Sequence, residues 1–123
     1  MQNKPQSYKD LNVWQKGIEL AKLIYTVTAQ FPPEEKFGLV SQMRRAAVSI
    51  PSNIAEGQAR HTTGEFIQFI SHAEGSVAEL NTQLILATEL HFCSAADVQS
   101  ASELTEDLRR MLNGLRRKLQ NAV

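Results

Sequence analysis

Residues 62–89 read TTGEFIQFISHAEGSVAELNTQLILATE, and this stretch decides the fold. Thr62, followed three residues later by Glu65, matches the capping-box pattern that opens a helix. Apolar residues then recur at alternating spacings of three and four, which is the period of one helix face. The members of this stripe are Phe66, Ile70, Ala73, Val77, Leu80, Leu84 and Ala87. The stretch therefore predicts an amphipathic helix about 40 Å long.

A first helix is expected upstream, over roughly residues 8–30. It holds two adjacent apolar rows, and two rows cover a wider face than one neighbouring helix needs. The first row is Leu11, Trp14, Ile18, Ala21 and Tyr25, and the second is Val13, Gly17, Leu20, Ile24 and Val27. The width of this face predicts a contact beyond the interior of a single bundle.

A second helix is expected to begin after the double proline Pro32-Pro33 and to end near Ala59. Pro51 lies inside it and lacks a backbone donor, so we expect a kink or a break near Ile50. Many of its residues are small, which allows another helix to approach closely. These small residues are Ala46, Ala47, Ser49, Ser52, Ala55 and Gly57.

A fourth helix is expected to start at Ser94 and Asp97, which again resemble a capping box. Its apolar stripe is Val98, Ala101, Leu104, Leu108, Met111, Leu115 and Leu119. Short links between long helices favour an antiparallel, up-down-up-down arrangement. The sequence thus predicts an all-α fold, a single four-helix-bundle domain over residues 1–123 that assembles as a homo-oligomer.

Composition places the chain among globular proteins and, by expectation, in the cytoplasm. Its hydrophobic fraction is 42% and its charged fraction 21%. The polar N-terminus lacks the apolar core of a signal peptide, and no apolar run is long enough to span a membrane. Cys93 is the single cysteine, which excludes an intrachain disulfide.

Charge is segregated along the chain although the formal net charge is zero. Residues 61–107 contain acidic side chains and no Lys or Arg, whereas residues 108–123 contain basic side chains and no acid. Two interpretations remain open. The segregation serves a polyanionic partner, or it pairs neighbouring helices of opposite sign.

Three ordered motifs resemble a known family. They are YKDLNVWQK at residues 8–16, RRAAVSIPSNIAEG at residues 44–57 and AEGSVAEL at residues 73–80. They resemble the bacterial four-helix-bundle proteins encoded in intervening sequences of 23S rRNA genes. This resemblance implies a ring-like homopentamer with no known enzymatic activity. The chain is more distantly similar to the accessory proteins of diversity-generating retroelements, which bind a reverse transcriptase and nucleic acid.

No constellation of residues indicates catalysis or a cofactor. Di-iron bundles need Glu three residues before His on two helices, and Phe69 and Thr88 occupy those positions before His72 and His91. Cys93 follows His91 by two residues, but it has no clear orienting partner and is better explained by packing. We expect a non-enzymatic protein with no metal, no cofactor and no small-molecule substrate.

The basic end of the fourth helix is the candidate nucleic-acid-binding site. Its members are Arg109, Arg110, Arg116, Arg117 and Lys118. Arginines on one rigid helix can contact phosphates, and a ring repeats the cluster in every subunit. The alternative is that these cations complement the helix C-terminus and pair with the acidic third helix.

Two further arginines are candidates for structural ion pairs. Arg44 and Arg45 lie among small and apolar residues, where an unpaired charge is costly. We expect one of them to pair with Glu79 or Glu56. Arg60 also lies four residues after Glu56 and offers that carboxylate a competing local partner.

Two functions are compatible with these features. The leading interpretation is a homo-oligomeric scaffold that binds RNA or a nucleic-acid-handling protein through basic patches. The other is a protein–protein interaction adaptor with no nucleic-acid role. The formal neutrality of the chain weakens the RNA interpretation, because dedicated nucleic-acid binders are usually basic.

Overall fold

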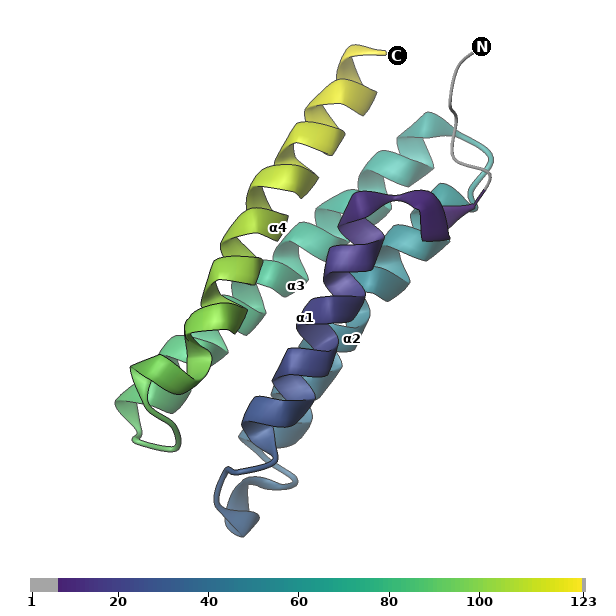
Figure 1. The fold of residues 1–123 in the computed structure, drawn as a ribbon. Helices are drawn as coiled ribbons and strands as arrows, with labels where there is room; N and C mark the ends of the chain where they lie inside the picture. The colour runs from purple at the N-terminus through teal and green to yellow at the C-terminus, as the bar shows by residue number, and fades with distance from the viewer. Residues whose placement is uncertain (1–6, 123) are drawn as a thin grey trace.

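The computed structural model describes residues 7–122 and forms four long helices (Figure 1). They are α1 (Asn12–Thr28), α2 (Leu39–Gln58), α3 (Thr63–Glu89) and α4 (Ala95–Asn121). Two short 3₁₀ turns, η1 (Tyr8–Asp10) and η2 (Pro33–Glu35), precede α1 and α2. No strand occurs in residues 7–122, so the predicted all-α fold with four helices is confirmed. Residues 1–6 and 123 of the predicted domain lie outside the described range.

The helices form a four-sided arrangement around one core. Helix α2 packs against α1 and α3, and α4 packs against α3 and α1. The start of α1, the end of α2, the start of α3 and the end of α4 lie at the same end of the molecule (Figure 1). Large side chains from every helix are fully buried at its centre. They include Leu20, Ile24, Met43, Ile50, Ile54, Ile70, Leu80, Leu84, Leu108 and Leu112.

Helix α3 follows the sequence pattern closely. Every member of its stripe from Ile70 to Ala87 is buried, and Phe66 is half-buried against the core. Thr62 caps the helix by accepting a 3.1 Å hydrogen bond from the backbone N–H of Glu65. Its hydroxyl also donates to Oε1 of Glu65 at 3.0 Å. The reciprocal capping box forms instead at the start of α4, between Ser94 and Asp97.

Helix α2 runs through Pro51 without interruption, so of the expected kink or break near Ile50 the break does not occur, and the kink stays a prediction. Side chains add hydrogen bonds in the same turns: Ser49 Oγ donates to the carbonyl of Ala46, and Asn53 Nδ2 donates to the carbonyl of Ser49. Pro51 is buried against α1, and a Cβ on Gly17 would lie 3.3 Å from its ring carbons. The proline therefore contributes to a close crossing of α1 and α2.

Several small residues of α2, among them Ala46, Ala47 and Gly57, are buried and serve packing within the chain. Gly57 is buried where α2 crosses α3, and a Cβ there would lie 2.7 Å from Cβ of Phe69. The expected close approach of another helix is confirmed. Because the approaching helices are α1 and α3 of the same chain, buried small residues such as Gly57 give no support to self-association, whereas Ser52 is exposed.

The expected first helix is divided at Leu11. This residue is extended (φ −82°, ψ 128°), so residues 8–10 form a separate turn capped by Ser7 before α1 begins. The second apolar row of α1 is largely buried, with Val13, Gly17, Leu20 and Ile24 in the core. The first row faces outward in part: Ile18 is 36% exposed and Tyr25 is 47% exposed.

Candidate interaction surfaces

The outward row of α1 borders an apolar surface shared with α2, here named the α1–α2 face. Part of it is a shallow groove of about 310 Å³. The groove is lined by Tyr8, Trp14, Ile18, Ala21, Val48, Pro51, Ser52 and Ala55. Val48 is 43% exposed, and the rings of Tyr8 and Trp14 meet edge to face at 5.4 Å. This surface places apolar side chains from two rigid helices next to water.

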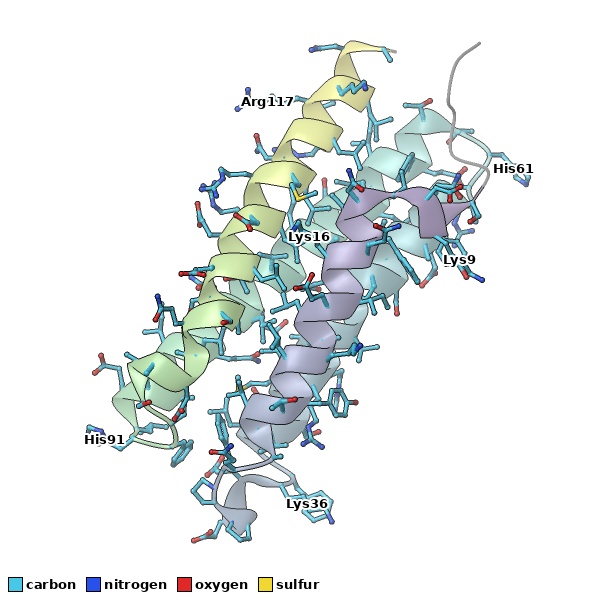
Figure 2. The ribbon with its side chains drawn as sticks, in the orientation of Figure 1. Lys9, Lys16, Lys36, His61, His91 and Arg117 are labelled. Atoms are coloured by element: carbon cyan, nitrogen blue, oxygen red, sulfur yellow. The ribbon has the colours of Figure 1, made fainter. Side chains whose placement is uncertain are left out.

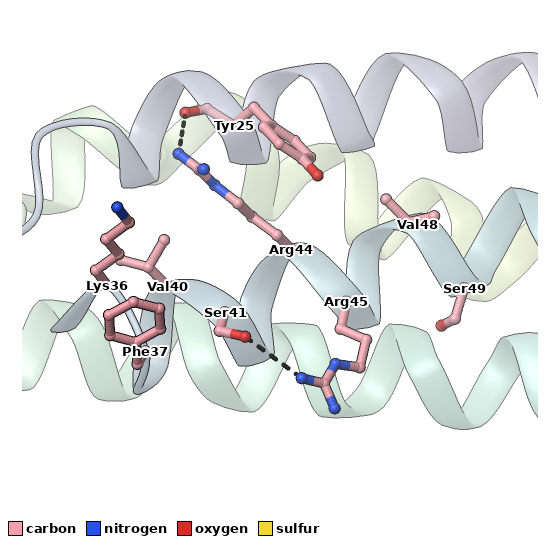
Figure 3. Close-up of a pocket in the computed structure, with 9 residues that line it drawn as sticks. All are labelled: Tyr25, Lys36, Phe37, Val40, Ser41, Arg44, Arg45, Val48 and Ser49. Atoms are coloured by element: carbon pink, nitrogen blue, oxygen red, sulfur yellow. Dashed lines mark hydrogen bonds between the residues drawn. The ribbon is translucent and has the colours of Figure 1, made fainter.

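The α1–α2 face continues into a larger basic cleft of about 620 Å³ (Figure 3). Its lining residues are Tyr25, Lys36, Phe37, Val40, Ser41, Arg44, Arg45, Val48 and Ser49. Three cations line it and no carboxylate does. Phe37 lies between η2 and α2 and is 89% exposed, with the ammonium of Lys36 5.5 Å from its ring centre. The sequence analysis did not single out Phe37. The sequence feature that marks it is an aromatic residue directly before Gly38, outside the apolar stripes of the first and second helices.

The expected ion pair of Arg44 or Arg45 with Glu56 or Glu79 does not form among residues 7–122. Arg44 faces α1, where its Nε donates to Oγ1 of Thr28 at 2.9 Å and its guanidinium stacks 4.4 Å from the Tyr25 ring centre. Arg45 donates to Oγ of Ser41 at 3.4 Å and is exposed (Figure 3).

The two carboxylates have other partners. Glu56 pairs at 3.7 Å with Arg60, which lies just beyond the end of α2. Glu79 accepts a hydrogen bond from Nε2 of Gln83 at 3.2 Å. Arg45 and Glu79 border the same cleft between α2 and α3 without an ion pair. The buried hydroxyl of Thr28 and the ring of Tyr25 satisfy Arg44 in place of a carboxylate.

The basic end of α4 is largely engaged with acids. Arg109 pairs with Glu106, and Arg110 pairs with both Glu106 and Asp107. The hydrogen bond from Arg109 lowers the pKa of Glu106 below its usual value. All of these side chains are exposed, so their pairs are individually weak.

The remaining three members of the cluster differ from one another. Arg116 donates from Nε to Oε1 of Glu74 in α3 at 2.7 Å, which confirms pairing with the acidic third helix for this residue. Arg117 donates to the neutral side chain of Asn113 at 3.1 Å and projects from the end of α4 (Figure 2). Lys118 is exposed. The structure therefore leaves Arg117 and Lys118 as the best-placed cations for an external anion.

A second apolar surface lies between α3 and α4, here named the α3–α4 groove. Its volume is about 540 Å³. It is lined by Leu84, Ile85, Thr88, Glu89, Ala95, Ala96, Val98, Gln99 and Ser102. Ile85 is 56% exposed, and the nearby Leu86 and Leu90 are 45% and 49% exposed. Of these three, Ile85 lines the groove, and its place outside the heptad-like stripe of α3 is the sequence signal for the groove.

Cys93 is placed as a packing residue. It is partly buried beside the core, and burial raises the pKa of its thiol, with a further increase from Asp97 and an opposing hydrogen bond from Thr88. A raised pKa disfavours the thiolate that nucleophilic catalysis requires. Within residues 7–122, His, Cys, Asp and Glu side chains form no group of three that could hold a metal ion.

None of the helices in residues 7–122 contains a stretch long and apolar enough to cross a membrane.

The model of one protein family matches residues 9–114, and that family is the 23S rRNA-intervening sequence proteins. The chain belongs to this family. Its three motifs at residues 8–16, 44–57 and 73–80 fall almost entirely inside the matched range, which confirms the resemblance. None of the curated proteins matches the chain.

A solved structure shares the fold of this 23S rRNA-intervening sequence protein. It is a protein with unknown function from the S23 ribosomal protein family of Bacteroides thetaiotaomicron. The two are 20% identical, and the superposition covers 85% of this chain and 97% of the other with a TM-score of 0.76. Neither the family nor this relative indicates an enzymatic activity.

Proposed function

We propose that this 23S rRNA-intervening sequence protein is a non-enzymatic scaffold, an antiparallel four-helix bundle that assembles with further copies of itself. The observation that carries the proposal is the α1–α2 face, where Ile18, Tyr25 and Val48 are each more than one-third exposed on adjoining rigid helices. Burying apolar surface stabilises an assembly by about 25 cal/mol per Å² removed from water. The family resemblance supplies the number of copies, which is five.

Light scattering coupled to size-exclusion chromatography tests self-association at micromolar concentration. We expect a mass several times that of the 13.7 kDa chain, and a clean monomer would overturn the proposal. Val48→Asp puts a charge on the α1–α2 face and should reduce the mass. Ser71→Asp alters an exposed position of α3 and is the matched control. Circular dichroism confirms that both variants keep their helix content.

A second candidate function, RNA binding, is supported by the exposed cations at the end of α4. Arg117 contacts only a neutral amide among its hydrogen-bond partners, and Lys118 follows it with no acid in residues 108–123. In a ring of five, each subunit contributes the same cations, so weak phosphate contacts act together. This candidate is the weaker of the two, because Arg109, Arg110 and Arg116 already form ion pairs with acidic side chains of the chain.

The RNA candidate predicts affinity that falls steeply as salt rises. Arg117→Glu should weaken binding and reduce the slope of log affinity against log salt by about 1 if the residue contacts one phosphate. Lys22→Glu makes the same charge change at an exposed position of α1 and should have a smaller effect. Equal effects of both variants, or binding that salt leaves unchanged, would favour a protein–protein adaptor with no nucleic-acid role.

A further inference from the structure

We propose that copies dock head to tail, with the α1–α2 face and basic cleft of one copy seated on the α3–α4 groove of the next. This inference rests on the self-association proposed above and names the two surfaces that meet. The backbones of α1 and α3 are not neighbours, and neither are those of α2 and α4, so the α1–α2 pair and the α3–α4 pair occupy opposite sides of the bundle (Figure 1). Each copy thus carries two different apolar surfaces that residues 7–122 leave uncovered.

The two surfaces carry opposite charge. The basic cleft is lined by Lys36, Arg44 and Arg45 and by no carboxylate. The α3–α4 groove is lined by Glu89 and by no Lys or Arg, and the whole segment of residues 61–107 contains no Lys or Arg. Joining the cleft to the groove therefore brings cations against acids. Joining two clefts by a two-fold axis brings like charges together, which favours the head-to-tail arrangement.

The charged groups lie at the same level of the bundle. Lys36 precedes α2 and Glu89 ends α3, and these helix ends lie at the same end of the molecule (Figure 1). Figure 2 shows Lys36 at this end, together with His91, which follows Glu89 by two residues. Two copies placed side by side with the same orientation therefore bring Lys36 of one copy to the level of Glu89 of the other.

Phe37 supplies the apolar part of the contact. Its ring is 89% exposed, and it projects from the connection between η2 and α2 at the edge of the basic cleft (Figure 3). The α3–α4 groove, at about 540 Å³, is walled by Ile85, Val98 and two alanines. Small alanines leave room between the helices for an aromatic side chain. Aromatic residues seated in such pockets dominate the affinity of many protein interfaces.

A mixing experiment distinguishes this arrangement from others. Phe37→Asp damages only the basic cleft, and Ile85→Arg damages only the α3–α4 groove. Both positions are exposed, so the core is unaffected. Each variant alone should run as a monomer by light scattering. A 1:1 mixture should form a dimer, because Phe37→Asp keeps an intact α3–α4 groove and Ile85→Arg keeps an intact basic cleft.

The outcomes separate this inference from the proposed function. A mixture that stays monomeric, or single variants that keep the wild-type mass, would overturn the head-to-tail arrangement while wild-type self-association stands. A monomeric wild-type protein would overturn both. As an independent measurement, Lys36→Glu and Glu89→Arg should each weaken association by about tenfold or more, and the double variant should recover most of the loss. Equal loss in the double variant would count against the facing of these two groups.

Discussion

Arg116 in α4 donates a hydrogen bond from its Nε to Oε1 of Glu74 in α3 over 2.7 Å, and both side chains are about three-quarters buried, at 26% and 22% exposed. The other ion pairs described within residues 7–122 join residues three or four apart, on α4 or between Glu56 of α2 and Arg60 just after its end. This pair therefore fixes the position of one helix against another, and it uses an arginine for which the sequence left two roles open, a contact with nucleic acid and a pair with the third helix.

Replacing Arg116 should destabilise the bundle. Arg116→Gln leaves Glu74 partly buried without its cation, and we expect a loss of about 1 kcal/mol, between the values for exposed and buried pairs. Urea unfolding of Arg116→Gln, Glu74→Gln and the double variant measures the coupling. Arg109→Gln is the control because its partner Glu106 is exposed and on the same helix, so its effect should be smaller. A zero coupling energy would contradict the assigned role.

Gly57 should be intolerant of alanine although it lies inside a helix. Alanine normally stabilises a helix interior by about 1 kcal/mol over glycine. At position 57 the new Cβ would meet Cβ of Phe69 at 2.7 Å, so the packing of α3 on α2 must shift, and we expect a net loss of about 1–3 kcal/mol.

Gly75 and Gly114 provide the matched controls for Gly57. Both are exposed in helix interiors, and a Cβ at either position meets nothing within 4 Å. Gly75→Ala and Gly114→Ala should therefore raise stability by about 0.5–1 kcal/mol. Thermal unfolding of the three variants should give opposite signs for Gly57 and the two controls, and the same sign for all three would show that α2 and α3 yield easily at their crossing.

The helices could be predicted from the sequence because their stripes repeat regularly. Helix α3 needed only its apolar period and Thr62, and α4 needed only its leucine stripe and Ser94. Leu11 shows where this reasoning fails. Its apolar side chain fits the helix pattern, but the extended backbone at that residue separates η1 from α1, and apolar periodicity carries no information on backbone angles.

The candidate sites were less predictable because sequence spacing does not reveal which partner a long side chain selects. Arg44 was expected to need a carboxylate, yet a threonine hydroxyl and a tyrosine ring from α1 satisfy it. Phe37 was not singled out, since its exposure depends on how the η2 turn enters α2. Charge segregation was informative at one point, because one of its two interpretations, pairing with the acidic third helix, holds for Arg116.

The capping box of α4 should make stability depend on pH in the acidic range. Asp97 accepts from the backbone N–H of Ser94 at 3.0 Å, and its hydrogen bonds to the backbone and side chain of Ser94 lower the pKa of its carboxyl. A carboxyl with a lowered folded-state pKa stabilises the fold above its unfolded-state pKa of about 3.9, and this contribution disappears as pH falls through the folded-state value.

Comparing wild type with Asp97→Asn by urea unfolding between pH 2 and pH 7 isolates this contribution. The two proteins should differ most above about pH 4 and converge at lower pH. Ser94→Ala removes the other half of the box and should cost about 1 kcal/mol at pH 7. A constant difference between wild type and Asp97→Asn at every pH would show that the charge of Asp97 has no part in capping.

Cys93 should react slowly with a neutral alkylating reagent in the folded protein. Burial raises the pKa of its thiol and Asp97 raises it further, whereas the hydrogen bond from Thr88 lowers it, and only the thiolate reacts. The rate of iodoacetamide labelling plotted against pH should therefore rise at a higher pH than the value of about 8.5 seen for a free cysteine. Unfolding in urea should move the curve back to that value and provides the internal control. Thr88→Val, which deletes the opposing hydrogen bond, should move the folded-state curve to still higher pH. A folded-state curve at or below the unfolded one would mean that the thiolate is stabilised, and Cys93 would then be a reactive residue instead of part of the packing between the end of α3 and the start of α4.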